Sequence, residues 1–153
     1  MIDRFENFAA YIAQANKYIL KIKAAGMERF GLKAAHLMCL YFLGKHEEGL
    51  TAGELAEYCM EDKAAISKSL SELRHKDFVR TDNENGTKVY RAKYFLSPTG
   101  KDAFAEIKDT ILHITELVAD GLSLEEGAIL YRSLEKVVSN LKDYYLEMDK
   151  PER

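Results

Sequence analysis

Prolines, cysteines and long apolar runs are scarce in this chain of 153 residues, which has only two prolines and two cysteines. The cysteines, Cys39 and Cys59, form no CxxC or zinc-binding pattern. No apolar run approaches the roughly 20 residues that a membrane-spanning helix needs. The N-terminal segment mixes charges with its apolar residues, unlike a secretory signal. We therefore expect a cytoplasmic protein whose thiols are reduced.

Sequence motifs for catalysis are also missing. The four histidines share no metal-ligand spacing, and the chain contains no P-loop, nucleophile elbow or GxGxxG sequence. Its carboxylates are scattered along helical surfaces, and nothing pairs them for acid–base chemistry. The sequence thus predicts a protein that is not an enzyme and that holds neither a metal nor a cofactor.

The net charge of -3 conceals a basic segment. Residues 1–62 hold 7 basic and 9 acidic side chains, residues 63–93 hold 8 and 4, and residues 94–153 hold 7 and 12. The three segments therefore carry -2, +4 and -5. A basic window between acidic flanks is typical of a surface that binds an acidic partner, although chance clustering on a solvated surface gives the same counts.

Apolar residues recur at spacings of three and four, which predicts helices over most of the chain. The first covers residues 3–25 and ends at Gly26 and Gly31, and the second, 33–46, is apolar almost all round and should be buried. Thr51 and Glu54 form a capping box that begins a short helix. Further helices are expected over 63–76, after Asp62 as its cap, over 98–121, and from a second capping box at Ser123 and Glu126.

The helical pattern is interrupted once. Asn85-Gly86 is a strong signal for a two-residue hairpin turn, and residues 89–96 are rich in β-branched and aromatic side chains. We expect a β-hairpin here as the only sheet. A short capped helix, a tight turn, a second helix and a hairpin follow one another in the order of a winged helix-turn-helix. The predicted fold is therefore mainly α, with a two-stranded wing.

The helix over 63–76 has one face suited to a DNA major groove. Ile66, Leu70 and Leu73 point toward the core. Outward or on the flanks lie small, hydroxyl and basic residues, which allow close approach and contact phosphates or base edges: Lys63, Ala64, Ser67, Lys68, Ser71, Arg74 and His75. Glu72 lies on a flank and is unfavourable there unless it is angled away. A plain solvated helix is the alternative interpretation.

The expected hairpin carries basic residues of its own. Thr87, Lys88 and Arg91 follow the Asn-Gly turn, and Lys93 shares a strand face with Arg91. Beside a groove-reading helix such side chains contact phosphates or enter a minor groove. Alternatively, they keep an exposed hairpin soluble and protect its edge.

Taken in order, these segments resemble the MarR family of bacterial transcription regulators. The resemblance rests on Leu50-Thr51, Glu54-Leu55-Ala56, Asp62-Lys63, Ser67-Lys68 and Leu96-Ser97-Pro98-Thr99-Gly100. The chain departs from the family pattern at two points. Asp77 stands where such proteins usually have a glycine in a left-handed conformation, and the wing lacks the usual Asp-x-Arg sequence.

The resemblance implies a homodimer that regulates transcription, most simply as a repressor, by binding an inverted-repeat operator. It implies one MarR-like domain, with a DNA-binding lobe over about 33–96 and a helical dimerisation region over about 1–30 and 97–150. Such proteins often bind small aromatic effectors, for which the candidate residues are Tyr11, Tyr18, His36, Tyr41 and His113. Each of these is equally well explained as a core or interface residue.

Two alternatives remain open from the sequence. A winged-helix module that binds protein and has lost DNA contact would explain Glu72 and the missing wing sequence. Cys59, at the end of the short helix, would be the residue for redox sensing if the protein has that property.

Overall fold

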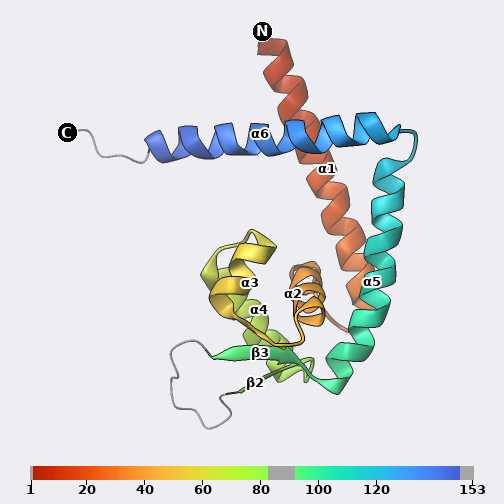
Figure 1. Cartoon of the computed structure of the whole chain (residues 1–153), viewed down its shortest axis with the longest axis vertical. Helices are drawn as coiled ribbons and strands as arrows, with labels where there is room; N and C mark the ends of the chain where they lie inside the picture. The colour runs from red at the N-terminus through yellow and green to blue at the C-terminus, as the bar shows by residue number, and fades with distance from the viewer. Residues whose placement is uncertain (1, 83–91, 149–153) are drawn as a thin grey trace, which may run out of the picture. The chain divides into compact units, whose positions relative to one another are not determined.

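The computed structural model describes residues 2–82 and 92–148, with side chains from residue 4 onward. The chain forms two compact units, Met1–Ile111 and Leu112–Arg153. Helix α5 begins in the first unit and continues into the second, which also contains α6 (Figure 1). None of the described helices is long and apolar enough to cross a membrane. The elements in chain order are α1 (Ile2–Glu28), α2 (Ala34–Lys45), β1 (Leu50–Thr51), α3 (Ala52–Cys59), α4 (Lys63–His75), β2 (Val79–Thr81), β3 (Lys93–Leu96), α5 (Pro98–Ala119) and α6 (Leu124–Met148).

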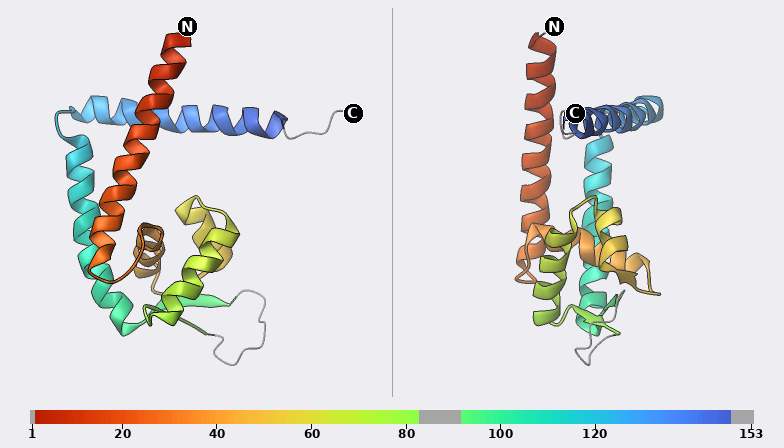
Figure 2. Two further views of the ribbon diagram at one scale, coloured as in Figure 1. Left: turned by 180° about the vertical axis from the view of Figure 1, so that it is seen from behind. Right: turned by 90° about the vertical axis from the view of Figure 1, so that its left-hand side faces the viewer.

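Helix α2 is the centre of the first unit. It packs against α1, α3, α4 and β3, and Figures 1 and 2 show it between α1 and the α3–α4 pair. Leu37, Leu40 and Leu43 on α2 are buried. Neighbours on several sides explain why this helix is apolar almost all round, since a helix with only one buried face needs only one apolar stripe.

The sheet is small and antiparallel, with the strand order β1-β3-β2. Val79 pairs with Leu96 and Thr81 with Tyr94, which gives the predicted antiparallel pairing at the base of the wing. The expectation of only two strands was incomplete, because β1 pairs with the other side of β3. A strand of two residues is too short to produce a periodic signal. The predicted turn at Asn85-Gly86 lies outside the described residues.

The predicted helix starts are confirmed by hydrogen bonds. Thr51 Oγ1 accepts the Glu54 amide at 3.2 Å, and the Glu54 carboxylate accepts the Thr51 amide at 2.8 Å. Asp62 Oδ1 accepts the Ala65 amide at 2.8 Å and so caps α4. Such caps satisfy N–H groups that a helix leaves without partners, typically for about 1 kcal/mol each. The end predicted for the first helix was too early, because α1 runs through Gly26 to Glu28.

The connection from β3 to α5 locks the end of α4 in place. The Ser97 hydroxyl donates to the Asp77 carbonyl at 2.6 Å and accepts the Gly100 amide at 3.0 Å. A Cβ atom at position 100 would lie 2.0 Å from the carbonyl oxygen of Phe78. Only glycine fits so close an approach, which gives a physical reason for the Ser-Pro-Thr-Gly sequence at this point.

Asp77 occupies the left-handed conformation, with φ of 60°, at the position where the MarR pattern has glycine. This conformation costs a non-glycine residue about 1–2 kcal/mol, whereas glycine costs about 0.5–1 kcal/mol in lost chain entropy. We therefore expect Asp77→Gly to raise the free energy of unfolding in urea by about 0.5–1 kcal/mol. Asp77→Ala, which loses the side chain that eases this conformation, should lower it by about 1 kcal/mol. Equal stabilities of the two variants would contradict the prediction.

Candidate nucleic-acid interface

Helix α4 separates its buried and exposed side chains as the sequence predicts. Ile66, Ser69, Leu70 and Leu73 are buried against the rest of the first unit. The exposed residues are Lys63, Ala64, Ser67, Lys68, Ser71, Arg74 and His75. A continuous polar and basic face is thus turned to solvent, on a helix whose N-terminus carries the positive end of its dipole.

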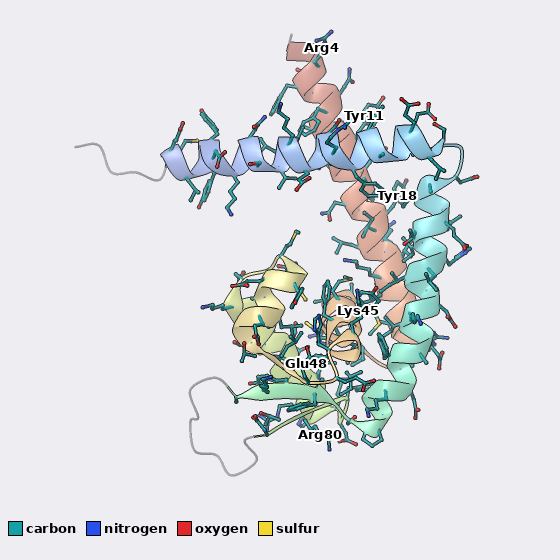
Figure 3. The ribbon with its side chains drawn as sticks, in the orientation of Figure 1. Arg4, Tyr11, Tyr18, Lys45, Glu48 and Arg80 are labelled. Atoms are coloured by element: carbon teal, nitrogen blue, oxygen red, sulfur yellow. The ribbon has the colours of Figure 1, made fainter. Side chains whose placement is uncertain are left out.

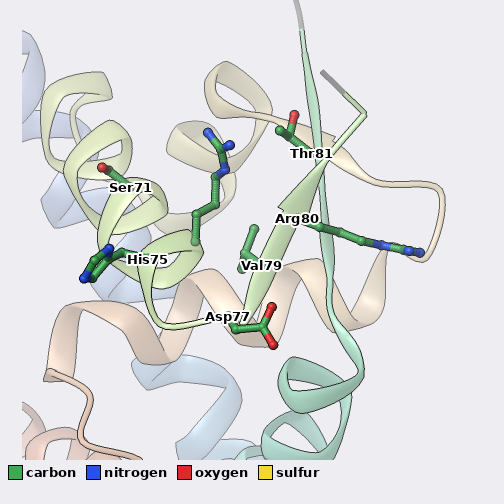
Figure 4. Close-up of a pocket in the computed structure, with 7 residues that line it drawn as sticks. Ser71, His75, Asp77, Val79, Arg80 and Thr81 are labelled. Atoms are coloured by element: carbon green, nitrogen blue, oxygen red, sulfur yellow. The ribbon is translucent and has the colours of Figure 1, made fainter. Parts of the chain in front are cut away.

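A pocket of about 420 Å³ lies where the C-terminal half of α4 meets β2. It is lined by Ser71, Arg74, His75, Asp77, Val79, Arg80 and Thr81. Figure 4 shows Ser71 and His75 on α4, with Thr81 across from them on β2. The Arg80 side chain points away from α4 in the same view. Arg80 therefore adds little to the α4 face, although the charge count assigns it to the basic segment.

Glu72 is the residue whose placement the sequence left open, and its carboxylate is turned back toward α2. Lys33 Nζ donates to its two oxygens at 2.9 and 2.8 Å, and His36 Nε2 lies 3.0 Å from Oε2. Only 27% of the Glu72 side chain is exposed. Glu72 therefore makes its contacts within the protein, and the expectation of an unfavourable acidic flank is removed.

The protonation of His36 follows from its partners. Its Nδ1 accepts the backbone N–H of Lys33 at 3.1 Å, so the neutral ring carries its proton on Nε2 and donates it to Glu72. Burial lowers the pKa of His36, against the opposing effect of Glu72, and nearby Lys33 and Lys76 lower it further. The hydrogen bond from Lys33 is the main cause that lowers the pKa of Glu72. The pair is thus a neutral imidazole beside a carboxylate.

The wing residues Thr87, Lys88 and Arg91 lie outside the described residues. At the base of the wing, the Lys93 amide donates to Asp82 Oδ1 at 2.9 Å. The Lys93 ammonium donates to the carbonyl of Glu48 at 3.2 Å. Lys93 therefore ties β3 to the loop before β1, a role that strand alternation does not predict.

The residues predicted to bind an effector have different surroundings. Tyr11 and Tyr18 project from α1 with 71% and 57% of their surface exposed (Figure 3). His36 is 1% exposed and has both ring nitrogens engaged, so its geometry does not favour ligand contact. Tyr41 is half-buried, with its ring near Phe42 and Phe104. His113 is an exposed residue of the second unit.

Both cysteines are free thiols of the first unit, where Cys39 is buried and Cys59 is half-buried, and each affects the pKa of the other. Contact with Cys59, together with burial, raises the pKa of Cys39. The thiol of Cys39 in turn lowers the pKa of Cys59. The more accessible thiol is therefore the one more readily ionised, which is the property that reactive cysteines need. Redox sensing itself stays a prediction.

Comparison with known proteins shows which family the chain is similar to. Residues 30–87 match the model of the MarR family. The structure of S. aureus MepR in complex with DNA is 18% identical, with 88% of this chain and 96% of that one covered and a TM-score of 0.77. A MarR/EmrR family transcriptional regulator from Acinetobacter sp. ADP1 is 20% identical, with coverages of 94% and 99% and a TM-score of 0.76. A Listeria monocytogenes structure with 26mer DNA is 16% identical, with coverages of 95% and 97% and a TM-score of 0.76.

No curated protein matches the chain in sequence. The resemblance to MarR-family transcription regulators is nevertheless confirmed, by sequence over residues 30–87 and by fold over most of the chain. The winged helix-turn-helix fold predicted from the order of elements is confirmed with it.

The lowered pKa of His36 predicts a pH-dependent stability. In the unfolded chain the ring has its ordinary pKa of 6.5 and takes up a proton before the folded protein does. The free energy of unfolding should therefore fall as the pH is lowered from about 7.5 to about 5.5. In this range Glu72 stays ionised, because its pKa is already lowered from 4.5. His36→Gln should show a smaller fall in urea unfolding, and an equal fall in both proteins would contradict the assignment.

Proposed function

We propose that the chain is a sequence-specific DNA-binding transcription regulator that acts as a homodimeric repressor on an inverted-repeat operator. The observation that carries the proposal is the exposed face of α4, where Lys63, Ser67, Lys68 and Ser71 lie on a helix that follows a capped α3 and a tight turn. In a helix-turn-helix the second helix enters the major groove and its outward side chains contact base edges. Two similar folds, MepR and the Listeria structure, are recorded with DNA.

The polar face supports distinct roles along α4. Ala64 and Ser67, near the N-terminus, are small enough to let the helix approach the bases closely. Lys68 and Ser71 supply donors for base edges or phosphates. Arg74 near the C-terminus and Lys63 at the start are placed to hold phosphates, which positions the helix without reading sequence.

The homodimer is supported by apolar side chains that neither unit buries. On α1, the exposed apolar residues include Phe5, Tyr11, Ile12, Tyr18 and Ile19. On α6, none of the described residues is buried, and the exposed apolar ones include Leu130, Leu141 and Tyr144. Extended exposed apolar surfaces are a feature of protein interfaces. A second copy would cover them and place two α4 helices on the two halves of an operator.

Release by a small aromatic ligand belongs to the same proposal. Tyr11 and Tyr18 would be its contacts from α1, whereas His36 is held by Lys33 and Glu72. A ligand of this kind acts only if it binds one conformation of the dimer more tightly than the other. The alternative function, a protein-binding module, rested on Glu72 and on the missing wing sequence. The first of these no longer favours it, because Glu72 is turned toward α2.

The DNA-binding proposal predicts that the protein selects a common motif from a pool of random duplexes. Binding of the selected duplex should weaken steeply with salt, because phosphate contacts release counterions. Arg74→Ala should flatten the plot of log affinity against log salt by about one unit. Lys68→Ala should instead change the selected motif, if its ammonium contacts a base.

Lys108→Ala is the matched control, since Lys108 is an exposed lysine on α5. It should leave both the salt slope and the motif as in the parent. Failure of the parent to enrich any motif, or binding that ignores salt, would contradict the proposed function and favour the protein-binding alternative.

The dimer proposal predicts a mass by light scattering of about 35 kDa, twice the 17.4 kDa of the chain. Leu141→Glu, at an exposed apolar position of α6, should shift the mass toward that of a single chain because a buried unpaired carboxylate destabilises the interface. Lys136→Glu, at an exposed position of the same helix, introduces the same carboxylate with a charge change twice as large and should leave the dimer intact. A parent protein with the mass of one chain would contradict the proposal.

A further inference from the structure

The recognition face of α4 is held by contacts on its protein side as well as by its apolar stripe. Two basic side chains join the segment just before α2 to the C-terminal end of α4. Lys33 donates to Glu72, and Lys76 donates to the carbonyl of Gly31 at 2.7 Å. Both sets of hydrogen bonds therefore link residues 31–36 to residues 72–76.

The contacts of Glu72 are more specific in geometry than the hydrogen bond from Lys76 to Gly31. Its carboxylate receives Lys33 on both oxygens and His36 on one. His36 cannot turn away easily, because its other nitrogen accepts the Lys33 amide and its ring is buried. Hydrogen bonds to an ionised acceptor are shorter and stronger than neutral ones. The buried His36 ring therefore restricts where the Glu72 carboxylate can lie, and the Lys33 ammonium, on a side chain that is 67% exposed, adds a second contact.

Small rotations matter for base contacts. A side chain at the surface of a helix lies about 5–6 Å from the axis, so a rotation of roughly 10° moves its tip by about 1 Å. Hydrogen-bond lengths vary within only about 0.5 Å. Ser71 is next to Glu72 in sequence and Lys68 lies about one turn before it. A rotation of α4 that moves Glu72 therefore displaces both side chains.

We propose that Glu72 is a positioning residue for DNA recognition, which holds α4 to α2 through Lys33 and His36 so that Lys68 and Ser71 meet base edges in register. The inference rests on the proposed function, that α4 binds DNA. Lys33 also neutralises the only acidic side chain within α4. Glu72 acts on specificity through the setting of its helix and makes no contact with the bases.

The test compares two affinities for each variant, one for the duplex selected by the parent and one for a shuffled duplex of the same composition. For Glu72→Ala we expect the ratio of the two affinities to fall about tenfold, which corresponds to losing one aligned base contact. Affinity for the shuffled duplex should stay equal or rise, because a negative charge near the phosphates has been removed. The fold should persist, since Lys76 and the buried residues of α4 are unchanged, and thermal unfolding checks this.

A solvated, merely structural Glu72 predicts a different result. Its removal would then raise both affinities by the same factor and leave the ratio unchanged, which would overturn the inference. Glu57→Ala is the matched control, because Glu57 is an exposed carboxylate on α3 and no ion pair of its side chain is recorded among the described residues. It should leave the ratio unchanged, and a fall as large as that of Glu72→Ala would also overturn the inference.

Variants of Lys33 test the ion pair with Glu72 without changing any residue of α4. Lys33→Met should lower the ratio, whereas Lys33→Arg keeps a donor for both oxygens and should retain the parent ratio. An unchanged ratio in Lys33→Met would contradict the positioning role. If the parent selects no duplex, the proposed function itself fails. If the parent selects one and every variant keeps its ratio, the function stands and the inference alone is refuted.

Discussion

The packing of α4 against α2 is the contact on which the arrangement of the first unit depends. Ile66, Leu70 and Leu73 bury the apolar side of α4 in the core, and the neighbouring Glu72 carboxylate meets Lys33 and His36. Burying these apolar side chains stabilises the unit without fixing one orientation, because hydrophobic contact is not directional. The hydrogen bonds of the Glu72 carboxylate are directional and favour one orientation of α4. Together they leave one face of α4 free, and that face is polar and basic.

The charge distribution follows from the same contact. The segment 63–93 is basic although the chain is acidic, and its one acidic residue within α4 is paired with Lys33 from outside the segment. The exposed face of the helix therefore keeps a positive character at close range. At physiological ionic strength charges beyond about 8 Å are largely screened, so the local pairing has more influence on an approaching phosphate than the net charge of -3.

Signals confined to a few neighbouring residues were predicted well from the sequence. The Thr51 and Asp62 caps and the inward stripe of α4 depend only on spacing along one helix. The contacts of Glu72 with Lys33 and His36 span 39 and 36 positions, and no pattern in a single sequence shows which helices meet or how their side chains turn. The strand β1 was missed for a related reason, because two residues carry no period. Asp77 illustrates a third case. The resemblance indicated its left-handed backbone, and the structure shows the hydrogen bonds that accompany it, from the Asp77 amide to the Arg74 carbonyl and from the Phe78 amide to the Leu73 carbonyl.

The central claim is that the outward face of α4, set by its contact with α2, is the surface that meets DNA. Mapping of backbone amide shifts by NMR during titration with the selected duplex tests it most directly. The account predicts that the largest changes fall on Ala64, Ser67, Lys68 and Ser71, while the exposed positions Glu57 on α3 and Lys108 on α5 change little. Changes concentrated on α3 or α5, with α4 unaffected, would contradict it.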